Sequence, residues 1–194
     1  MSPEMSPGMS MALASVEVLP VDGRPSEPDG FREFVEARSS ALLRSGWLLT
    51  GDWPSAEDLV QTALAAAWPR WTSLTRQDAP ELYVRKIMVN TFLRWRRRRW
   101  TGEIATGRLP EMQAAGDAFA QIDARQALIA ALDRLPPRQR AVVVLRYFAD
   151  QTEAQTADAM GCSVGAVKAH ASKALARLRG APGLAELMTG GVAS

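Results

Sequence analysis

Residues 135–179, LPPRQRAVVVLRYFADQTEAQTADAMGCSVGAVKAHASKALARLR, decide the fold of this chain. The stretch predicts three helices, of which the last two form a helix-turn-helix. Thr152 with Gln155 three residues later is the pattern of a capping box and predicts the start of the middle helix. This helix is expected to end at Met160-Gly161, because glycine permits the left-handed turn that stops a helix. Two short helices joined by a tight glycine-containing turn can place the second helix in the major groove of DNA.

The last helix of the stretch is expected to begin after Ser163, whose side chain can cap the backbone N–H groups of the first turn. Apolar residues at spacings of three and four predict its buried face: Val164, Val167, Ala171, Leu175 and Leu178. Lys168, Ser172 and Lys173 lie off that face, and no acidic residue stands between Ser163 and Arg179. Such a helix can pack inward and meet a polyanion outward. The plainer alternative is a three-helix bundle with a solvated basic face.

The length and composition of the chain limit the classes of protein to which it can belong. The 194 residues suffice for one large or two small domains. The net charge is +2, and of 23 basic residues only Lys86, Lys168 and Lys173 are lysine, which leaves 20 arginines. Arginine suits phosphate and base recognition, although a GC-rich genome gives the same bias. Cys162 and His170 are the only residues of their types, which excludes an internal disulfide and a cysteine metal cluster. We expect no cofactor, no metal and no enzymatic activity.

The predicted fold class is all-α, with two small helical domains joined by a flexible linker. The expected segments are a disordered extension over 1–30, a first domain over 31–100, a linker over 101–120, a second domain over 121–180 and a tail over 181–194. No apolar run approaches the length that spans a membrane, and the N-terminus lacks an apolar signal core. We therefore expect a soluble, cytoplasmic protein.

The first domain is expected to open with a helix over 31–49, which residues 50–54 break. Ser55 then caps a second helix, with Glu57 and Asp58 in the first turn, where carboxylates favour the positive end of the helix dipole. Its expected buried residues are Leu59, Leu64 and Trp68. A mostly polar strip on another side comprises Asp58, Gln61, Thr62 and Ala65. Ordinary solvation is the simplest interpretation of this strip.

A basic helix is expected to start at Pro80 and to run to Trp100. From Arg85 to Trp100 there are seven basic residues and no acid, which is too much positive charge for pairing within the helix to neutralise. Steps of four, four and three place one set on a common side: Lys86, Asn90, Arg94 and Arg97. A phosphate backbone would neutralise this stripe and release counterions. The amide of Asn90 can both donate to and accept from a base edge.

Two aromatic residues of this helix allow two interpretations. Tyr83 and Trp100 can pack in the core, which is the preferred interpretation, or stack on an unpaired base. The arginine run also has an alternative, in which cations at a helix C-terminus oppose the dipole, but this explains only one or two arginines.

Taken in order, four motifs resemble the sigma-70 family of bacterial RNA polymerase initiation factors. They are AEDLVQTAL at 56–64, VRKIMVNTFLRWRRRR at 84–99, LPPRQRAVVVLRYF at 135–148 and the helix-turn-helix. The resemblance covers roughly residues 31–180 and is closest to the small extracytoplasmic-function (ECF) type, in its sigma-E-like subfamily. It implies bacterial core RNA polymerase and promoter DNA as partners. An anti-sigma protein is a further candidate partner.

The resemblance also implies a role for each polar surface. The strip of Asp58, Gln61 and Thr62 matches the part that docks on the clamp helices of the largest polymerase subunit, which replaces plain solvation. Asn90 matches the pocket for a base extruded from the −10 element. The residues that would hold the −10 backbone are Lys86, Arg94, Arg97 and Arg98. Those that would contact the −35 duplex are Ser163, Lys168, Ser172 and Lys173, with Arg177 on phosphate. The linker would thread toward the active-site channel and the RNA exit path.

This chain departs from the family pattern at a few positions. Arg94 stands where many members carry an acid, and Ala166 and Ala169 are small for a reading helix, which favours readout of backbone and DNA shape. The implied function is a promoter-specificity subunit that promotes strand opening. The alternative is a free-standing helix-turn-helix regulator, which leaves the run at 94–99 and the strip at Asp58 without a role.

Overall fold

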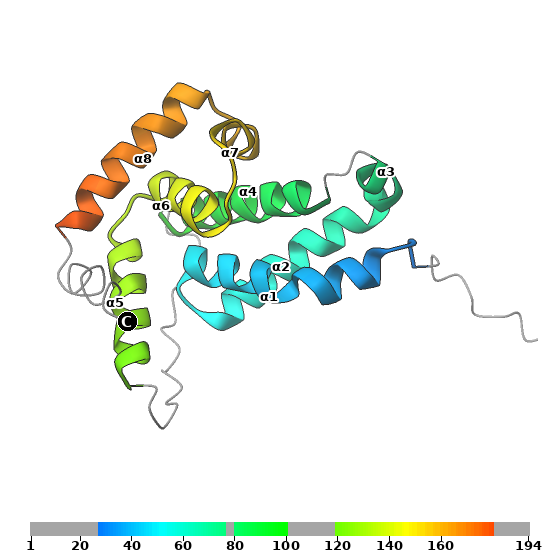
Figure 1. Ribbon diagram of the computed structural model, residues 1–194, viewed down its shortest axis with the longest axis horizontal. Helices are drawn as coiled ribbons and strands as arrows, with labels where there is room; N and C mark the ends of the chain where they lie inside the picture. Colours follow the sequence, from blue (N-terminus) through cyan, green and yellow to red (C-terminus); the bar gives the residue numbers. More distant parts are fainter. Residues whose placement is uncertain (1–26, 77–79, 101–118, 181–194) are drawn as a thin grey trace, which may run out of the picture.

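The computed structural model describes residues 27–76, 80–100 and 119–180, and every regular element among them is helical (Figure 1). The first half contributes α1 (Phe31–Thr50), α2 (Trp53–Ala67), η1 (Trp68–Arg70), α3 (Trp71–Arg76) and α4 (Pro80–Trp100). The second half contributes α5 (Phe119–Asp133), α6 (Pro137–Val143), the π-helical turn η2 (Val144–Phe148), α7 (Glu153–Met160) and α8 (Val164–Arg179). The expected all-α fold class is confirmed. Of the predicted extension (1–30), linker (101–120) and tail (181–194), residues 1–26, 101–118 and 181–194 lie outside the described residues. The last two residues of the predicted linker, Phe119 and Ala120, already belong to α5.

The first two helices pack side by side at close range. A Cβ atom on Gly46 of α1 would lie 3.1 Å from the carbonyl oxygen of Ala56 in α2, so glycine is what permits this approach. Leu42, Leu49 and Leu59 are buried where the two helices meet the core. The contact forms the platform on which α4 lies.

Helix α4 presents two different faces to the protein. Val84, Met88 and Phe92 are buried against the first two helices, as expected from their spacing. In Figure 1, α4 runs between this platform and the pair α6–α7. The position of α4 therefore brings its polar side close to the second half of the chain.

The start of α2 corrects the expectation for this region. The helix begins at Trp53, not after Ser55, and its N-cap is Asp52, whose carboxylate accepts a hydrogen bond from the Ser55 backbone N–H at 2.8 Å. Pro54 lies in the first turn, where its missing N–H leaves no hydrogen bond unmade. The predicted break is thus only two residues long, and the first turn of α2 carries no acidic residue.

The caps of the helix-turn-helix are confirmed. The Thr152 hydroxyl accepts from the Gln155 N–H at 3.1 Å, and the Gln155 side chain accepts from the Thr152 N–H at 2.8 Å. Gly161 ends α7 with φ 59° and ψ 44°, the left-handed conformation that glycine adopts readily. Ser163 caps α8 by accepting from the Ala166 N–H at 3.2 Å.

The predicted buried face of α8 is partly wrong. Val167 and Leu178 are buried, but Val164 in the first turn is 38% exposed and Ala174 is fully buried in the middle of the helix. The buried stripe of α8 is therefore rotated about the helix axis relative to the predicted one. Lys168, which was expected off this stripe, remains on the exposed side.

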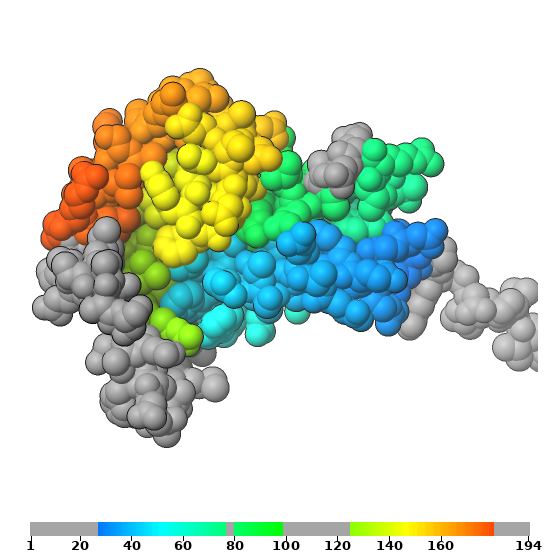
Figure 2. Space-filling view, in the orientation of Figure 1, coloured from blue at the N-terminus to red at the C-terminus, as the bar shows by residue number. Residues whose placement is uncertain are grey.

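Both halves of the chain contribute to one hydrophobic core. Buried residues of α1, α2 and α4 cluster with those of α5 to α8, and Figure 2 shows the second half lying directly on the first. We call the contact between the first and the second half of the chain the seam. A buried polar contact also crosses it. Arg140 of α6 is 1% exposed, and its Nε donates to the carbonyl oxygen of Leu48 in α1 at 2.6 Å. Its guanidinium also pairs with Asp133, and burial lowers its pKa.

Candidate nucleic-acid interface

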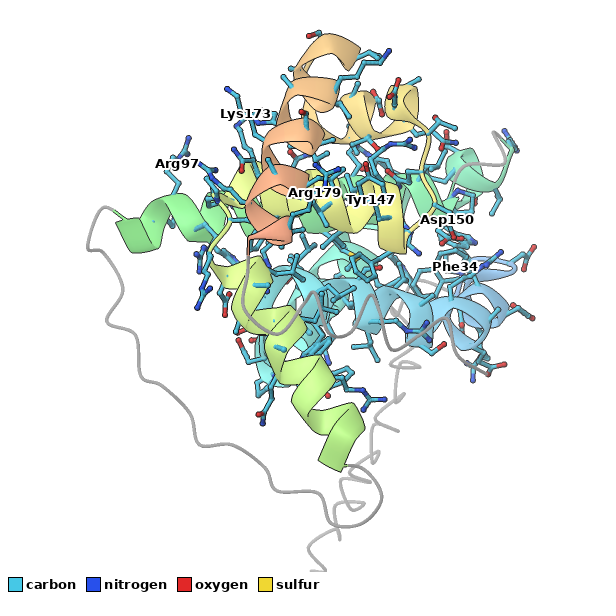
Figure 3. The ribbon with its side chains drawn as sticks, turned by 60° about the vertical axis from the view of Figure 1, so that its left-hand side comes forward. Phe34, Arg97, Tyr147, Asp150, Lys173 and Arg179 are labelled. Atoms are coloured by element: carbon cyan, nitrogen blue, oxygen red, sulfur yellow. The ribbon has the colours of Figure 1, made fainter. Side chains whose placement is uncertain are left out.

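The basic stripe of α4 is largely confirmed as a surface. Asn90, Arg94, Arg97 and Arg98 are exposed, and the side chain of Lys86 is 40% exposed. In Figure 3, the side chain of Arg97 points away from the ribbon of α4. The helical spacing therefore places an amide among several cations on one side of the helix. A nucleic-acid backbone fits such a surface because its phosphates neutralise the cations.

One basic residue of the run does not belong to this surface. Arg85 is only 5% exposed, and its guanidinium pairs with Glu81 at 2.7 Å and donates to the Ser45 hydroxyl at 2.6 Å. Pairing within the helix therefore neutralises Arg85, one of the seven basic residues counted in this run. Glu81, the acidic partner of Arg85, lies one helical turn before it in α4, and Ser45, the hydroxyl partner, lies in α1.

The structure decides whether Tyr83 packs in the core or is free to stack on a base. Tyr83 is half-buried against the core, and its hydroxyl accepts a hydrogen bond from Arg70 at 2.9 Å. Core packing is therefore confirmed for Tyr83. The side chain of Trp100 lies outside the described residues.

Two members of the α4 stripe are engaged by the second half of the chain. The Lys86 ammonium lies 3.0 and 3.1 Å from the two carboxylate oxygens of Asp158 in α7. The amide of Asn90 donates to the carbonyl oxygen of Ala159 at 3.3 Å. Nothing in the sequence pattern of either helix indicated these contacts, because they join residues about seventy positions apart.

Helix α8 carries the second basic surface. Lys168, Ser172 and Lys173 are exposed, as predicted, and Lys168 lies 3.5 Å from Glu153 in α7. Figure 3 shows Lys173 pointing away from the body of the protein. Of the two remaining predicted residues, Ser163 uses its hydroxyl as the N-cap of α8.

The last predicted member of the α8 surface, Arg177, is exposed but donates to the side chain of Gln139, a buried residue of α6. This contact fixes the C-terminal part of α8 on α6.

His170 lies among these cations and was not assigned a role from the sequence. Its pKa is lowered, first by partial burial and then by the positive charges of Arg138 and Lys173. The neutral imidazole is therefore favoured in the free protein. Its place beside Lys173 on the basic side makes it a sensitive reporter of any phosphate that approaches α8.

The polar strip of α2 borders an apolar hollow that the sequence did not indicate. Asp58, Gln61 and Thr62 are exposed, and Gln61 forms one edge of a surface hollow of about 510 Å³. The other lining residues are Phe31, Leu64, Ala65 and Trp68. Leu64 and Trp68 were expected to be buried and are only half-buried. Their apolar surface and the strip form one continuous candidate docking site.

Other classes of site are not seen in the part of the chain that the structure describes. Within those residues, no three histidine, cysteine or acidic side chains gather closely enough to hold a metal ion. None of the described helices combines the length and apolar character needed to cross a membrane.

Two basic helical surfaces, one of them in a helix-turn-helix, are typical of a DNA-binding protein. The sequence profile described as "Sigma-70 region 2" matches residues 34–101, and that described as "Sigma-70, region 4" matches residues 125–178. The chain is 42% identical over 149 residues to a protein of Streptomyces coelicolor named RNA polymerase sigma-E factor, covering 77% of this chain and 84% of that protein. It is 30% identical over 176 residues to the ECF RNA polymerase sigma factor SigG of Mycobacterium tuberculosis, covering 77% of this chain and 48% of that protein.

The chain thus belongs to the sigma-70 family of RNA polymerase sigma factors and is of the ECF type. Its fold is similar to that of the sigma factor RpoE from Bartonella quintana, solved in complex with the anti-sigma factor NepR. The TM-score is 0.63 at 23% identity, over 78% of this chain and 96% of that one. The protein is a transcription initiation factor, and its partners are core RNA polymerase and promoter DNA. The alternative of a free-standing regulator is not favoured.

Proposed function

We propose that α4 and α8 divide promoter recognition between them, with α4 on the opened −10 element and α8 on the −35 duplex. The observation that carries this proposal is the surface of α4, where the exposed Asn90 lies among Lys86, Arg94, Arg97 and Arg98. An amide within a row of cations has the chemistry of a base-reading group held on a phosphate backbone.

Base capture gives α4 a part in strand opening. Extruding a base from a duplex costs about a few kcal/mol, and release of counterions from neutralised phosphates offsets part of this cost. In our proposal, Arg94, Arg97 and Arg98 hold the backbone while Asn90 exchanges hydrogen bonds with the extruded base. The free energy of binding thereby favours the open complex over the closed complex.

Helix α8 supplies the duplex contacts of the proposed function. Lys168 and Lys173 contact phosphate or base edges, Ser172 reads a base edge, and Arg177 reaches phosphate after leaving Gln139. Ser163 contributes mainly by capping the helix, so its N-terminal N–H groups remain oriented toward the DNA. Ala166 and Ala169 are small, so recognition on this helix relies in part on backbone position and DNA shape.

Docking on core polymerase is assigned to α2. In this proposal Asp58, Gln61 and Thr62 form the polar part of the contact, and the hollow beside Phe31 and Trp68 receives an apolar side chain of the polymerase. A polar rim around an apolar centre is the usual anatomy of a protein interface.

We further propose that the protein catalyses no reaction and works in the cytoplasm, where bacterial polymerase and DNA meet. An anti-sigma protein is a candidate regulator. The support for this is that the similar fold of RpoE from Bartonella quintana was solved with such a partner.

Run-off transcription tests the proposed function. Purified full-length protein is mixed with sigma-free core polymerase and a pool of promoters from its own genome. We expect transcripts that require both the protein and particular promoters, and these reveal the −35 and −10 sequences. Absence of core-dependent transcripts, together with a specific duplex shift by the protein alone, would contradict the division of labour proposed for α2, α4 and α8.

A further inference from the structure

A hollow of about 360 Å³, which we call the seam hollow, lies at the N-terminal end of α4. Phe34 of α1 and Leu82 of α4 line it on one side, and Ala149 and Gln155 line it on the other. Figure 3 shows Phe34 and Asp150 close together at this place. The volume lies at the small end of the range of about 300–1,000 Å³ that sites for small molecules occupy. None of the lining residues is assigned a contact with DNA or polymerase.

Gln151 gives the seam hollow an amide that lacks hydrogen bonds. This lining residue is 3% exposed, and neither its side-chain nitrogen nor its side-chain oxygen has a partner among the described residues. Its backbone is fixed, because the N–H donates to the carbonyl oxygen of Leu145 at 3.0 Å and the carbonyl oxygen accepts from Arg146. A buried polar group without a partner costs free energy. A molecule that offers both a donor and an acceptor at this place would recover that cost.

The charged groups around the seam hollow are balanced in number but separated in space. Arg38 and Arg85 share the carboxylate of Glu81, at 3.3 and 2.7 Å, which leaves an excess of positive charge on the side of α1 and α4. On the other side, the exposed carboxylate of Asp150 forms no ion pair or hydrogen bond with any residue that the structure describes. A ligand that carries one negative and one positive group can neutralise both sides.

These features distinguish between classes of ligand. A metal ion would be repelled by Arg38 and Arg85, and a phosphate would be repelled by Glu81 and Asp150. A wholly apolar molecule would leave the amide of Gln151 without partners. A small zwitterion with an amide group meets none of these objections, and its methylene groups can contact the apolar wall of the hollow.

We propose that the seam hollow binds a free α-amino acid with an amide side chain. Its carboxylate pairs with Arg38, whose Nε alone is engaged by Glu81, so that the two Nη groups remain for the ligand. Its ammonium group pairs with Asp150, and its side-chain amide exchanges hydrogen bonds with Gln151. This binding site is separate from the proposed function, because the residues that form it take no part in promoter or polymerase binding.

Isothermal titration calorimetry of the full-length protein with L-glutamine tests the proposal. We expect saturable binding of one molecule per chain with a Kd of about 1 mM or tighter. The melting temperature should rise as L-glutamine is added, because a ligand that binds only the folded chain stabilises it. D-glutamine has the same groups and charges but cannot place all of them on the same three partners. It should therefore bind about tenfold more weakly.

Two variants locate the binding in the seam hollow. Gln151→Met keeps a side chain of similar size and removes both amide atoms, which have no partner in the free protein. The fold should therefore be no less stable, while the affinity for L-glutamine falls about tenfold or more. Asp150→Asn removes the charge but keeps a residue that tolerates the left-handed conformation, φ 50°, and should also weaken binding. Glu57→Gln, at an exposed position of α2, removes the same charge elsewhere and should leave the affinity unchanged.

Each outcome of these titrations supports or overturns the site. The absence of saturable binding at about 10 mM L-glutamine, ten times the expected Kd, would leave the hollow to water and overturn the proposal. Equal affinities for L- and D-glutamine would show an adventitious additive only. An unchanged affinity in Gln151→Met or in Asp150→Asn would place the binding elsewhere and also overturn it. None of these results bears on promoter recognition, which run-off transcription tests separately.

Discussion

His170 of α8 has a pKa that reflects the surroundings of its imidazole. Partial burial, Arg138 and Lys173 all lower its pKa, so folding favours the neutral imidazole. Relative to an ordinary value of about 6.5, a lowered pKa means that the unfolded chain binds the proton first as the pH falls. The contribution of His170 to stability is therefore complete above that value and is lost as the pH falls toward the lowered pKa.

A proton NMR titration of the free protein should show this directly, because His170 is the only histidine in the chain. The midpoint should lie below the ordinary value, and Lys173→Ala should move it upward by removing a nearby positive charge. Binding of a −35 duplex should also raise it, since phosphate favours the imidazolium. A free-protein midpoint at or above the ordinary value would contradict the environment described for His170.

At the scale of the element, the helix-turn-helix depends on its caps. Ser163→Ala removes the acceptor for the Ala166 N–H and should lower the free energy of unfolding by about 1 kcal/mol, measured by urea denaturation. Ser163→Gly is the matched control and should cost only a few tenths of a kcal/mol, since glycine is tolerated at this position. A Ser163→Ala chain as stable as the wild type would show that the hydroxyl does not act as a cap.

The basic side of α8 predicts a salt effect. Lys168→Ala and Lys173→Ala should each weaken binding of the polymerase holoenzyme to a −35 duplex and reduce the salt slope by about one. Arg44→Ala, at an exposed position of α1, is the control and should leave the slope unchanged. A wild-type slope in either lysine variant would reject that lysine as a phosphate contact.

The elements also show which features a sequence can predict. The caps of α7 and α8 followed from residues within four positions of one another, because a capping hydrogen bond is local. The start of α2 was misplaced because Asp52 and Ser55 are both good caps and only one can be used. The sequence counted Arg85 in the basic run and did not show that it is buried, because its hydroxyl partner Ser45 lies 40 residues away in α1.

The arrangement of the whole molecule was the least predictable part. The all-α class and the separate basic surfaces followed from composition and periodicity. The seam did not, because it is formed by contacts such as Arg140 to Leu48, 92 residues apart, whose pairing no helical period encodes. The apolar hollow beside Gln61 was missed for a similar reason: Phe31 and Trp68 come from different helices and meet only in the folded chain.

For the molecule as a whole, the proposed function depends most on α4, which carries Lys86 and Asn90. The same hydrogens of Lys86 and Asn90 hold α7 in the free protein and, in our proposal, hold the −10 strand at the promoter. The central claim is therefore that Asn90 acts in strand opening rather than in the first encounter with duplex DNA.

Permanganate footprinting of a promoter bound by core polymerase and this protein tests that claim most directly. Thymines of the −10 element should become reactive with the wild type. With Asn90→Ala their reactivity should fall by a factor that corresponds to about 1–3 kcal/mol, the discrimination of one good base contact, while duplex binding before opening changes little. Gln126→Ala, which removes an exposed amide from α5, should match the wild type in both steps. Equal losses of Asn90→Ala in duplex binding and in thymine reactivity would contradict the claim.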